Sequence, residues 1–282
     1  MAAVNRQGPN HTCEYARNSA HIPDGLCYGP VVSRRFGSSL GVSFSPPGVW
    51  ACHWRCPYCQ QGKQPLDPAA HAPAADILRA VSHGLHTHAA TTDVICVAGG
   101  GEPSDHPDFA ALSIGLGQLA RQLGKSLILL TNGDGCTSAD NLRSLENYTR
   151  IYAKWDPGVS AGAWQESPST VPAQTVATRV ATRLAAVQAI SQVCIQAMLF
   201  WTQHGTGNGS PTARAAWLEV MRQLQPREIH LTTVDRDPRL IAVQAVPEAE
   251  LLCWQRAVAQ VTMAPCRIFP AHSHPVPGKQ CP

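Results

Sequence analysis

The hydrophobic residues of this chain follow two alternating spacings. Short apolar runs, typical of buried strands, are separated by segments whose apolar residues recur every three or four positions, as on one face of a helix. The predicted strands cover residues 40–44, 94–98, 126–131, 150–154, 193–201 and 228–234. The predicted helices cover residues 75–85, 109–123, 140–147, 175–191, 213–224 and 248–261, with irregular loops at 157–172 and 205–211. The pattern therefore predicts an α/β protein.

Consecutive strands that are joined by helices pair in parallel through right-handed crossovers. Six such strands form either a doubly wound sheet or a barrel, complete or partial. In both folds the residues that follow the strands share one edge of the sheet, where functional sites are built. Polar and glycine-rich residues occupy these positions here: the segments 52–59 and 99–102, Asn132, Asp156 and His204. We expect the functional site at this edge.

Composition narrows the class of protein. The chain has 282 residues, of which 44% are hydrophobic and 15% charged, as in a compact globule. No window approaches the ~20 consecutive apolar residues of a membrane span, and the polar start contains no apolar signal-peptide segment. These features predict a cytoplasmic protein without a membrane partner. A formal charge of +3 is too small to indicate nucleic-acid binding by itself.

Cysteine is the most informative residue type. An odd number of cysteines, eleven, without a signal peptide argues against a disulfide framework and favours metal or redox chemistry. Most of them are scattered along the chain. Cys52, Cys56 and Cys59 instead lie within eight residues of one another. This cluster is the first candidate for chemistry.

The cluster has the spacing Cys-x3-Cys-x2-Cys, which lets three thiols converge on one metal centre. Structural zinc sites are usually closed by four ligands on paired knuckles, and the sequence has no second knuckle. The same spacing also suits a catalytic zinc with three protein ligands, or a set of inert thiols. A four-iron cluster held by three cysteines leaves one iron open to a substrate or cofactor. The spacing favours this iron–sulfur cluster.

The motif also has an aromatic residue before its last cysteine, and it resembles the signature of the radical S-adenosylmethionine (SAM) superfamily. Segment 97–103 reads Val-Ala-Gly-Gly-Gly-Glu-Pro, follows the second predicted strand and is similar to that superfamily's Gly-Gly-Glu motif. Segment 28–42 resembles the opening of a broad family that includes the wybutosine tRNA-modifying synthases. The segments at 154–156, 195–198 and 233–236 resemble that family's later strand ends.

The resemblance implies a partial (β/α)6 TIM-like barrel with N- and C-terminal extensions. The core barrel would cover residues 28–240, with an N-terminal extension at 1–27 and a C-terminal helix and tail at 241–282. It further implies an enzyme that holds a 4Fe-4S cluster on Cys52, Cys56 and Cys59 and binds SAM at the open iron. An external one-electron reductant, of flavodoxin or ferredoxin type, would drive SAM cleavage. The resulting 5′-deoxyadenosyl radical would abstract hydrogen from a substrate.

The same resemblance implies contacts with the cofactor. The three glycines Gly99, Gly100 and Gly101 would let the backbone approach SAM, where a side chain would not fit. Glu102 would pair with the cofactor ammonium, the alternative being a solvated carboxylate. Tyr58 would lie against the adenine or serve only as a packing aromatic residue.

Other candidates for contacts with the cofactor's ribose and carboxylate end the third, fourth and fifth predicted strands: Asn132, Lys154, Asp156 and Gln196. Each could instead be a surface polar group or a structural hydrogen-bonding group. Arg34 and Arg35 could bind a carboxylate or phosphate of the substrate, bind the cofactor carboxylate, or form a structural ion pair. Four residues at the end of the sixth predicted strand could line the substrate side or form hydrogen bonds at the edge of the core: Thr232, Thr233, Asp235 and Arg236. His83, His86 and His88 are interpreted as solvated rather than as a second metal site.

The remaining cysteines raise two further possibilities. An auxiliary iron–sulfur cluster would need the two ends of the chain to meet, because its four thiols would be Cys13, Cys27, Cys266 and Cys281. Solitary thiols are the commoner outcome. The second possibility is a hydrogen-atom donor, for which the candidates are Cys96, Cys136 and Cys194, with buried core thiols as the alternative.

These residues do not fix the substrate. A small molecule, such as a specialised metabolite, is the first hypothesis, because no appended domain for RNA or peptide is evident. A tRNA base is the second, by analogy with the wybutosine branch, and it predicts a basic rim around the open end of the barrel. A glycyl-radical activase is a further alternative. A structural zinc or iron–sulfur protein without turnover is disfavoured, because a structural site has no need of the glycines before Glu102.

Overall fold

The computed structural model describes residues 25–61, 64–158, 173–202, 207–236, 238 and 243–272. Residues 159–172 of the predicted loop at 157–172 lie outside these residues, as do His204, Cys13 and Cys281. The strands are β1 (Cys27–Ser33), β2 (Gly37–Val42), β3 (Val94–Val97), β4 (Ser126–Thr131), β5 (Arg150–Lys154), β6 (Cys194–Thr202), β7 (Glu228–Thr233), β8 (Val243–Ala245) and β9 (Cys266–Phe269). The helices are α2 (Ala74–His88), α3 (Phe109–Gln122), α4 (Ala139–Ser144), α5 (Ala173–Gln188), α6 (Pro211–Leu224) and α7 (Glu248–Val258).

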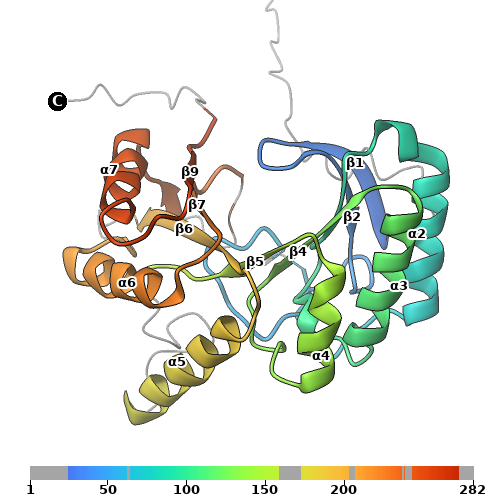
Figure 1. The fold of residues 1–282 in the computed structure, drawn as a ribbon, viewed down its shortest axis with the longest axis horizontal. Helices are drawn as coiled ribbons and strands as arrows, with labels where there is room; N and C mark the ends of the chain where they lie inside the picture. Colours follow the sequence, from blue (N-terminus) through green and yellow to red (C-terminus); the bar gives the residue numbers. More distant parts are fainter. Residues whose placement is uncertain are drawn as a thin grey trace, which may run out of the picture.

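All of the predicted strands are present, as β2 to β7, and each pairs in parallel with the next. The sheet runs β1-β2-β3-β4-β5-β6-β7-β9, with β8 paired to β6 outside this path (Figure 1). The crossovers between β2 and β7 are helical, through α2, α3, α4, α5 and α6 in turn. This order is the result that short crossovers between consecutive parallel strands dictate.

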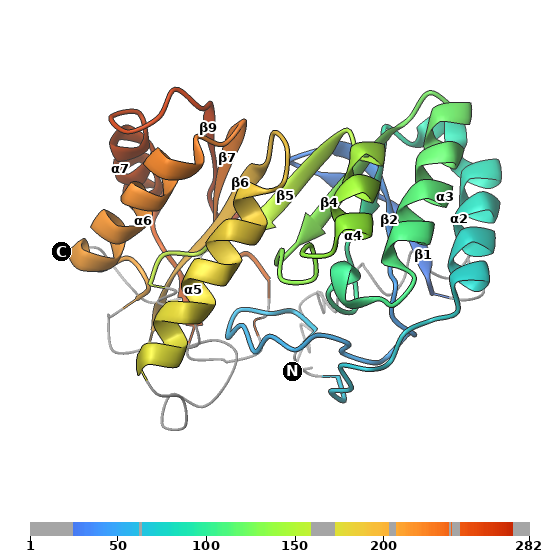
Figure 2. The same ribbon diagram turned by 60° about the horizontal axis from the view of Figure 1, so that its bottom comes forward.

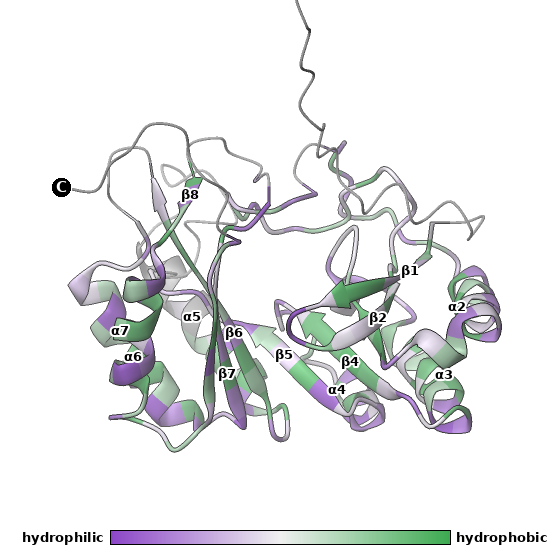
Figure 3. Cartoon of the chain, turned by 90° about the horizontal axis from the view of Figure 1, so that it is seen from above, coloured by the Kyte–Doolittle hydropathy of each residue, from purple (hydrophilic) through white to green (hydrophobic). Residues whose placement is uncertain are grey.

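The sheet curls into an open half-barrel, which confirms the predicted partial TIM-like barrel. Viewed from above, the strands trace an arc with the helices on its convex side (Figure 3). Along β4, Leu127 and Leu129 belong to the core between sheet and helices, whereas Ile128 faces a second apolar cluster on the concave side. Side chains of a strand point alternately to its two faces, so each strand supplies both clusters.

Two strands at the edges of the sheet were not predicted. β1 pairs antiparallel with β2, and β9 pairs in parallel with β7. Both are hard to recognise in the sequence, since β1 contains the breakers Gly29 and Pro30 and β9 has only four residues. The proposed division at residues 27/28 and 240/241 stays a prediction. None of the helices in the described residues has the length and hydropathy of a membrane span.

Candidate cofactor site at the carboxyl ends of the strands

The cysteine motif lies on a loop that crosses the carboxyl ends of the parallel strands. Figure 2 shows this light-blue loop passing below the sheet, at the end toward which β4 points. Its start is fixed by backbone pairing, because Ala51 donates to the carbonyl of Gly100 at 3.0 Å and accepts from the amide of Glu102 at 2.9 Å. The fold therefore joins the cysteine loop directly to the glycine-rich end of β3.

The glycines allow this close approach between backbone segments. A Cβ atom on Gly101 would lie 1.8 Å from the carbonyl oxygen of Ala51, and one on Gly99 would lie 2.7 Å from the Ser43 Cβ. Real side-chain atoms do not tolerate such distances, so neither position accepts a larger residue without movement of the chain. The sequence interpretation assigned the glycines to the cofactor, but the structure shows that they first make room for residues 43–51.

The three cysteines of the motif are half-buried on one short loop. The Sγ atom of Cys52 accepts a hydrogen bond from the amide of Trp54 at 3.3 Å, and the carbonyl of Cys56 accepts from the amide of Cys59 at 3.1 Å. Burial raises the pKa of Cys52, and it raises the pKa of Cys56 to about 12. Within the described chain, no three Cys, His, Asp or Glu side chains are grouped as ligands of one ion, so the thiols share a loop without converging.

Glu102 is buried at the end of β3 and is held by its own chain. One carboxylate oxygen accepts hydrogen bonds from the Ser104 hydroxyl at 2.7 Å and the Thr131 hydroxyl at 2.5 Å. The other accepts from the amide of Asn132 at 2.6 Å and keeps a second lone pair. Burial is the largest influence and raises the pKa of Glu102 to about 6. The solvated carboxylate considered from the sequence is wrong, since the residue is 7% exposed.

Asn132 follows β4 beside Glu102 and is also buried. Its side-chain oxygen accepts from the amide of Asp134 at 2.9 Å. Its side-chain nitrogen Nδ2 is buried and has no hydrogen-bond partner in the described structure. A buried donor without an acceptor costs about 1–3 kcal/mol, so this atom marks a position where a ligand acceptor is missing.

Tyr58, Lys154 and Asp156 form a polar cluster that ties the cysteine loop to β5. The Tyr58 hydroxyl donates to Asp156, which also accepts from the amide of Met198 at 2.6 Å. The Lys154 ammonium lies 3.7 Å from Asp156 and 4.5 Å from the centre of the Tyr58 ring. Burial raises the pKa of the Tyr58 hydroxyl well above its usual value. Tyr58 thus packs against the strand ends and anchors the loop through its hydroxyl.

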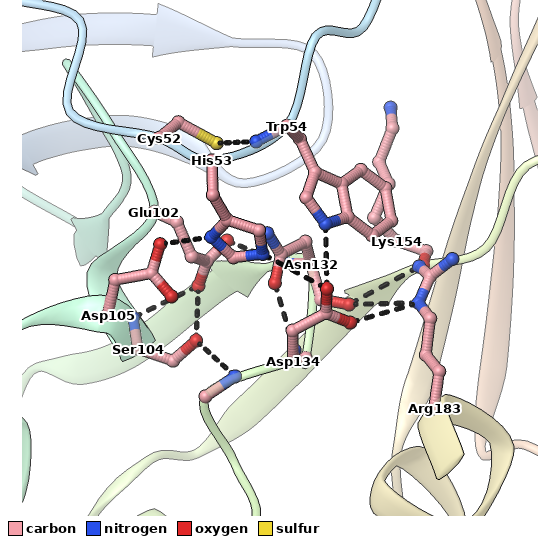
Figure 4. A network of polar contacts seen from close by, with 12 residues as sticks. Cys52, His53, Trp54, Glu102, Ser104, Asp105, Asn132, Asp134, Lys154 and Arg183 are labelled. Atoms are coloured by element: carbon pink, nitrogen blue, oxygen red, sulfur yellow. Dashed lines mark hydrogen bonds and ion pairs between the residues drawn. The ribbon is translucent and has the colours of Figure 1, made fainter. Parts of the chain in front are cut away.

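A second polar network, centred on Asp134, fixes the other side of the loop (Figure 4). Asp134 Oδ2 accepts from the Trp54 indole at 2.7 Å and lies 3.1 Å from His53 Nε2. The other ring nitrogen of His53 lies 2.6 Å from Asp105. Burial alone would lower the pKa of His53, but these carboxylates outweigh it and raise the pKa to about 10. His53 is therefore an imidazolium that bridges two loops.

Arg183 of α5 completes this network. Its guanidinium lies 3.5 Å from the Asp134 carboxylate and stacks between Trp54, at 4.2 Å, and Trp155, at 4.7 Å. It also donates to the backbone carbonyls of Asn132 and Lys154. Sequence reasoning missed Arg183 and Asp134, because their partners come from loops that are distant in sequence. The one signal in the sequence was Asp134 itself, which lies two residues after the candidate Asn132.

The other predicted residues lie in different surroundings. Gln196 is half-buried on β6, in register with Lys154 of β5. Thr232 and Thr233 donate to carbonyls of β6, which is the hydrogen bonding at the core edge given as one alternative. Arg34 forms the structural ion pair, with Asp235 at 2.9 Å.

The scattered cysteines do not form a second centre among the described residues. Cys27 and Cys266 lie on β1 and β9, the strands at opposite ends of the sheet order. Cys96 and Cys194 belong to the apolar cluster of the concave face, and burial raises the pKa of Cys96 to about 11. Cys136 is fully buried in the main core.

The residues at this edge fit a thiolate-ligated cluster with SAM beside it. Three cysteines on one loop could supply the donor set of an iron–sulfur cluster with one open position. Next to them stand the Asn132 amide nitrogen, which can donate to a carboxylate or hydroxyl, and the Glu102 oxygen, which can accept from an ammonium. The donors and acceptors of an amino-acid ligand therefore have complements here.

Comparisons with known proteins agree with this geometry. Residues 51–155, which contain both motifs, match the model of the radical SAM superfamily. A UPF0026 protein of Synechocystis is 28% identical over 74% of this chain and 75% of its own length. A UPF0026 protein of Helicobacter pylori is 31% identical over 38% of this chain, and the match spans about a third of that relative, 35%.

Two groups of solved structures share the fold at low sequence identity. SuiB of Streptococcus suis superposes with a TM-score of 0.55 at 12% identity, over 82% of this chain and 49% of its own. Spore photoproduct lyase gives a TM-score of 0.54 at 10% identity, over 95% and 88% of the two chains. The matched segment carries the cysteine loop, the glycine-rich strand end and polar residues that join them, so this part of the chain is similar to the radical SAM superfamily.

Proposed function

We propose that the chain binds a 4Fe-4S cluster through Cys52, Cys56 and Cys59 and cleaves SAM reductively at the carboxyl ends of β3 to β6. The observation that carries this proposal is the three-thiol loop, paired through Ala51 to the glycine-rich end of β3. SuiB has been solved bound to SAM, and a mutant of spore photoproduct lyase with bound SAM and dinucleoside spore photoproduct. Both have the fold seen here.

Residues around the loop would bind the amino-acid end of SAM. The Glu102 oxygen with a free lone pair accepts from the ammonium, and the Asn132 amide nitrogen donates to an oxygen of the same ligand. Lys154 supplies a positive charge at 17% exposure, close to the loop. When bound, the reduced cluster and SAM supply the 5′-deoxyadenosyl radical, which abstracts a substrate hydrogen.

The chain's own contribution to this chemistry is positioning. Tyr58 holds the last cysteines against β5 through Asp156, and the Asp134 network holds the first cysteine through Trp54 and His53. The loop is thus attached on both sides, so its thiols and the strand-end residues keep one relative orientation. Buried aromatic groups around the loop exclude water from the reacting region.

The reductant and the substrate are also part of the proposal. We propose an external one-electron donor of flavodoxin or ferredoxin type and a small-molecule substrate. Hydrogen abstraction from it would lead to oxidation, as in an oxidoreductase, or to rearrangement, epimerisation, carbon–carbon joining or sulfur insertion. The resemblance to wybutosine synthases suggests a tRNA base instead, but the formal net charge of +3 does not by itself indicate nucleic-acid binding, so we keep the small molecule as the first hypothesis. Co-purification of tRNA with the chain would reverse this preference.

Anaerobic reconstitution tests the proposal. After incubation with iron and sulfide, the protein should hold a four-iron cluster, and with dithionite and SAM it should form 5′-deoxyadenosine. Cys56→Ala should lose both the cluster and the product. Cys253→Ala, which removes a half-buried thiol on α7, should keep both and serves as the control. A stoichiometric zinc ion in place of iron would contradict the proposal.

A further inference from the structure

The turn between β1 and β2 contains two neighbouring arginines, Arg34 and Arg35, whose side chains differ in their partners. Arg34 pairs with Asp235 and donates to the carbonyl of Pro270 at 2.5 Å. The guanidinium of Arg35 forms no ion pair or hydrogen bond with any residue that the structure describes, and its Nη1 atom is buried. It lies instead over the face of the Phe36 ring, at 4.8 Å. The residue is half-buried, and a cation with a buried, unpartnered nitrogen is costly, so an anion beside this atom would stabilise it.

Arg35 belongs to the concave face of the half-barrel. Its neighbour Phe36 packs on Tyr152 of β5 at 5.1 Å and on His230 of β7 at 6.0 Å. The charge of Arg35 interacts with Cys96 of β3 and with Tyr152. The carboxylate on this face, Glu228, does not serve as its counter-ion.

Glu228 is instead engaged by other groups. It accepts from the Tyr152 hydroxyl at 3.0 Å and from His230 at 2.9 Å, and Arg267 and Arg150 lie 3.7 Å and 3.9 Å away. These partners account for both carboxylate oxygens. The concave face therefore carries a surplus of positive charge, and Arg35 is the part of it that lacks a partner among the described residues.

His230 provides a second unpartnered atom on the same face. The side chain is fully buried, and its Nδ1 atom has no hydrogen-bond partner within the part of the chain that the structure describes. Because Glu228 can only accept, the proton of the neutral ring resides on Nε2, and Nδ1 is an acceptor. A ligand that reaches this position must present a hydrogen-bond donor.

The His230 atom lies in the register row of Lys154, a residue proposed to bind the cofactor, whereas Arg35 reaches the concave face from the turn before β2, at the amino ends of the strands. Lys154, Gln196 and His230 occupy one register row across β5, β6 and β7, and alternate residues of these strands face the concave side. The rings of Tyr152 and Phe269 lie 4.5 Å and 4.8 Å from the His230 ring. A half-buried cation with a buried Nη1 atom, a buried acceptor and aromatic walls are thus brought together on the concave face.

We propose that this part of the concave face binds the substrate, and that the substrate carries an oxyanion, a carboxylate or a phosphate, held by Arg35. A hydrogen-bond donor of the same molecule meets His230 Nδ1, and its apolar part lies against Phe36 and Tyr152. Calling the ligand the substrate rests on the proposed function. The anion site itself does not depend on it.

Calorimetric titration and thermal denaturation of the full chain test the anion site without the cluster. The probes are benzoate, acetate and inorganic phosphate, with benzyl alcohol as the uncharged analogue of benzoate. Benzoate should bind and stabilise the wild type more than acetate does, because it adds ring contacts, and benzyl alcohol should not bind. Stronger binding of phosphate than of both carboxylates would identify the substrate anion as a phosphate.

The variants are matched, since Arg34 and Arg35 are adjacent and carry the same charge. Arg35→Gln should weaken anion binding by about tenfold or more, whereas Arg34→Gln should keep it. Without ligand, Arg35→Gln should be at least as stable as the wild type, because it removes a half-buried charge that lacks a counter-ion among the described residues. If Arg35→Gln does not fold, Arg35→Lys replaces it and should lose the same affinity, since an ammonium lacks the planar fork.

Two results would overturn the inference. The first is anion binding that is absent in the wild type or unchanged in Arg35→Gln. The second is loss of SAM binding in Arg35→Gln, which would assign the guanidinium to the cofactor carboxylate. Failure to form 5′-deoxyadenosine, together with intact Arg35-dependent anion binding, would contradict the proposed function and leave the anion site standing.

Discussion

Gly101 shows how a single hydrogen atom in place of a side chain shapes this site. A Cβ atom at this position would lie 1.8 Å from the Ala51 carbonyl oxygen, inside the backbone pairing that starts the cysteine loop. Gly101→Ala should therefore push the loop away from β3 and lower the free energy of unfolding by about 1–3 kcal/mol. Urea denaturation measures this loss.

Gly100→Ala is the matched control for that substitution. The nearest atom to a Cβ on Gly100 is the Val49 carbonyl oxygen at 3.1 Å, a distance that a small movement relieves. The control should lose clearly less stability than Gly101→Ala. Equal losses would show that backbone flexibility at the strand end, rather than the close approach to Ala51, requires the glycines.

His230 makes a residue-level prediction about pH. Burial lowers the pKa of His230 to about 4, although Glu228 partly opposes this. In the unfolded chain this histidine is protonated below about pH 6.5, whereas in the folded chain it stays neutral down to about pH 4. The free energy of unfolding therefore falls as the pH drops from about 6.5 toward 4. The slope is at most about 1.4 kcal/mol per pH unit for this one group, and it vanishes above about pH 6.5.

Chemical denaturation between about pH 7 and pH 5 tests this dependence, above the range in which most carboxylates titrate. His230→Gln should flatten the curve in this window. His83→Gln, at an exposed position of α2, should leave the slope as in the wild type. If the pH dependence of the free energy of unfolding has the same slope in His230→Gln as in the wild type, another group with a lowered pKa in the folded chain is its cause.

At the scale of elements, α5 is coupled to the cysteine loop through Arg183. The guanidinium joins the carboxylate of Asp134 to the rings of Trp54 and Trp155. Arg183→Met keeps the length of the side chain but removes its charge, and it should cost about 3 kcal/mol because Asp134 loses a buried partner. Hydrogen exchange should increase in segment 52–59.

The control for this variant is another arginine of a helix. Arg222→Met removes an exposed pair with Glu219 on α6, where the expected loss is small. Hydrogen exchange in segment 52–59 should then equal that of the wild type. Unchanged hydrogen exchange of segment 52–59 in Arg183→Met would show that α5 does not stabilise the cysteine loop through Arg183.

The packing of α7 on α6 extends the core beyond the predicted barrel. Trp254 of α7 is fully buried and meets Trp217 of α6 edge-on, with ring centres 5.5 Å apart. Trp254→Ala should lower the stability by about 3–5 kcal/mol, as for other large cavities. Leu252→Ala, at a position that is 37% exposed, should cost much less, and similar losses in both variants would contradict this account.

At the scale of the whole molecule, the half-barrel was predictable because its strands repeat one local pattern. The run at 126–131, for example, is largely apolar and ends at Asn132-Gly133, so it reads as a buried strand without any knowledge of its neighbours. β9 has no such pattern. It is specified by its pairing with β7 rather than by its own four residues.

The candidate site was predictable only in part, for the same reason. Short stretches of sequence suffice to predict this part of the site, because one motif contains Cys52, Cys56 and Cys59 and a recognisable strand precedes Glu102. The Asp134–Arg183 ion pair joins a loop to a helix that is distant in sequence. The Arg35 Nη1 atom is unpartnered because no described residue places an acceptor beside it. Such features arise from the packed chain, and apart from the position of Asp134 two residues after Asn132 the sequence carries no signal of them.

The account depends on three thiols that leave one iron open to SAM. The most direct measurement is the EPR spectrum of the reduced, reconstituted protein before and after addition of SAM whose carboxylate oxygens carry a magnetic isotope. The account predicts that SAM shifts the g-values and that the label broadens the signal, since the carboxylate then binds iron. A cluster whose spectrum is the same with and without labelled SAM would contradict it.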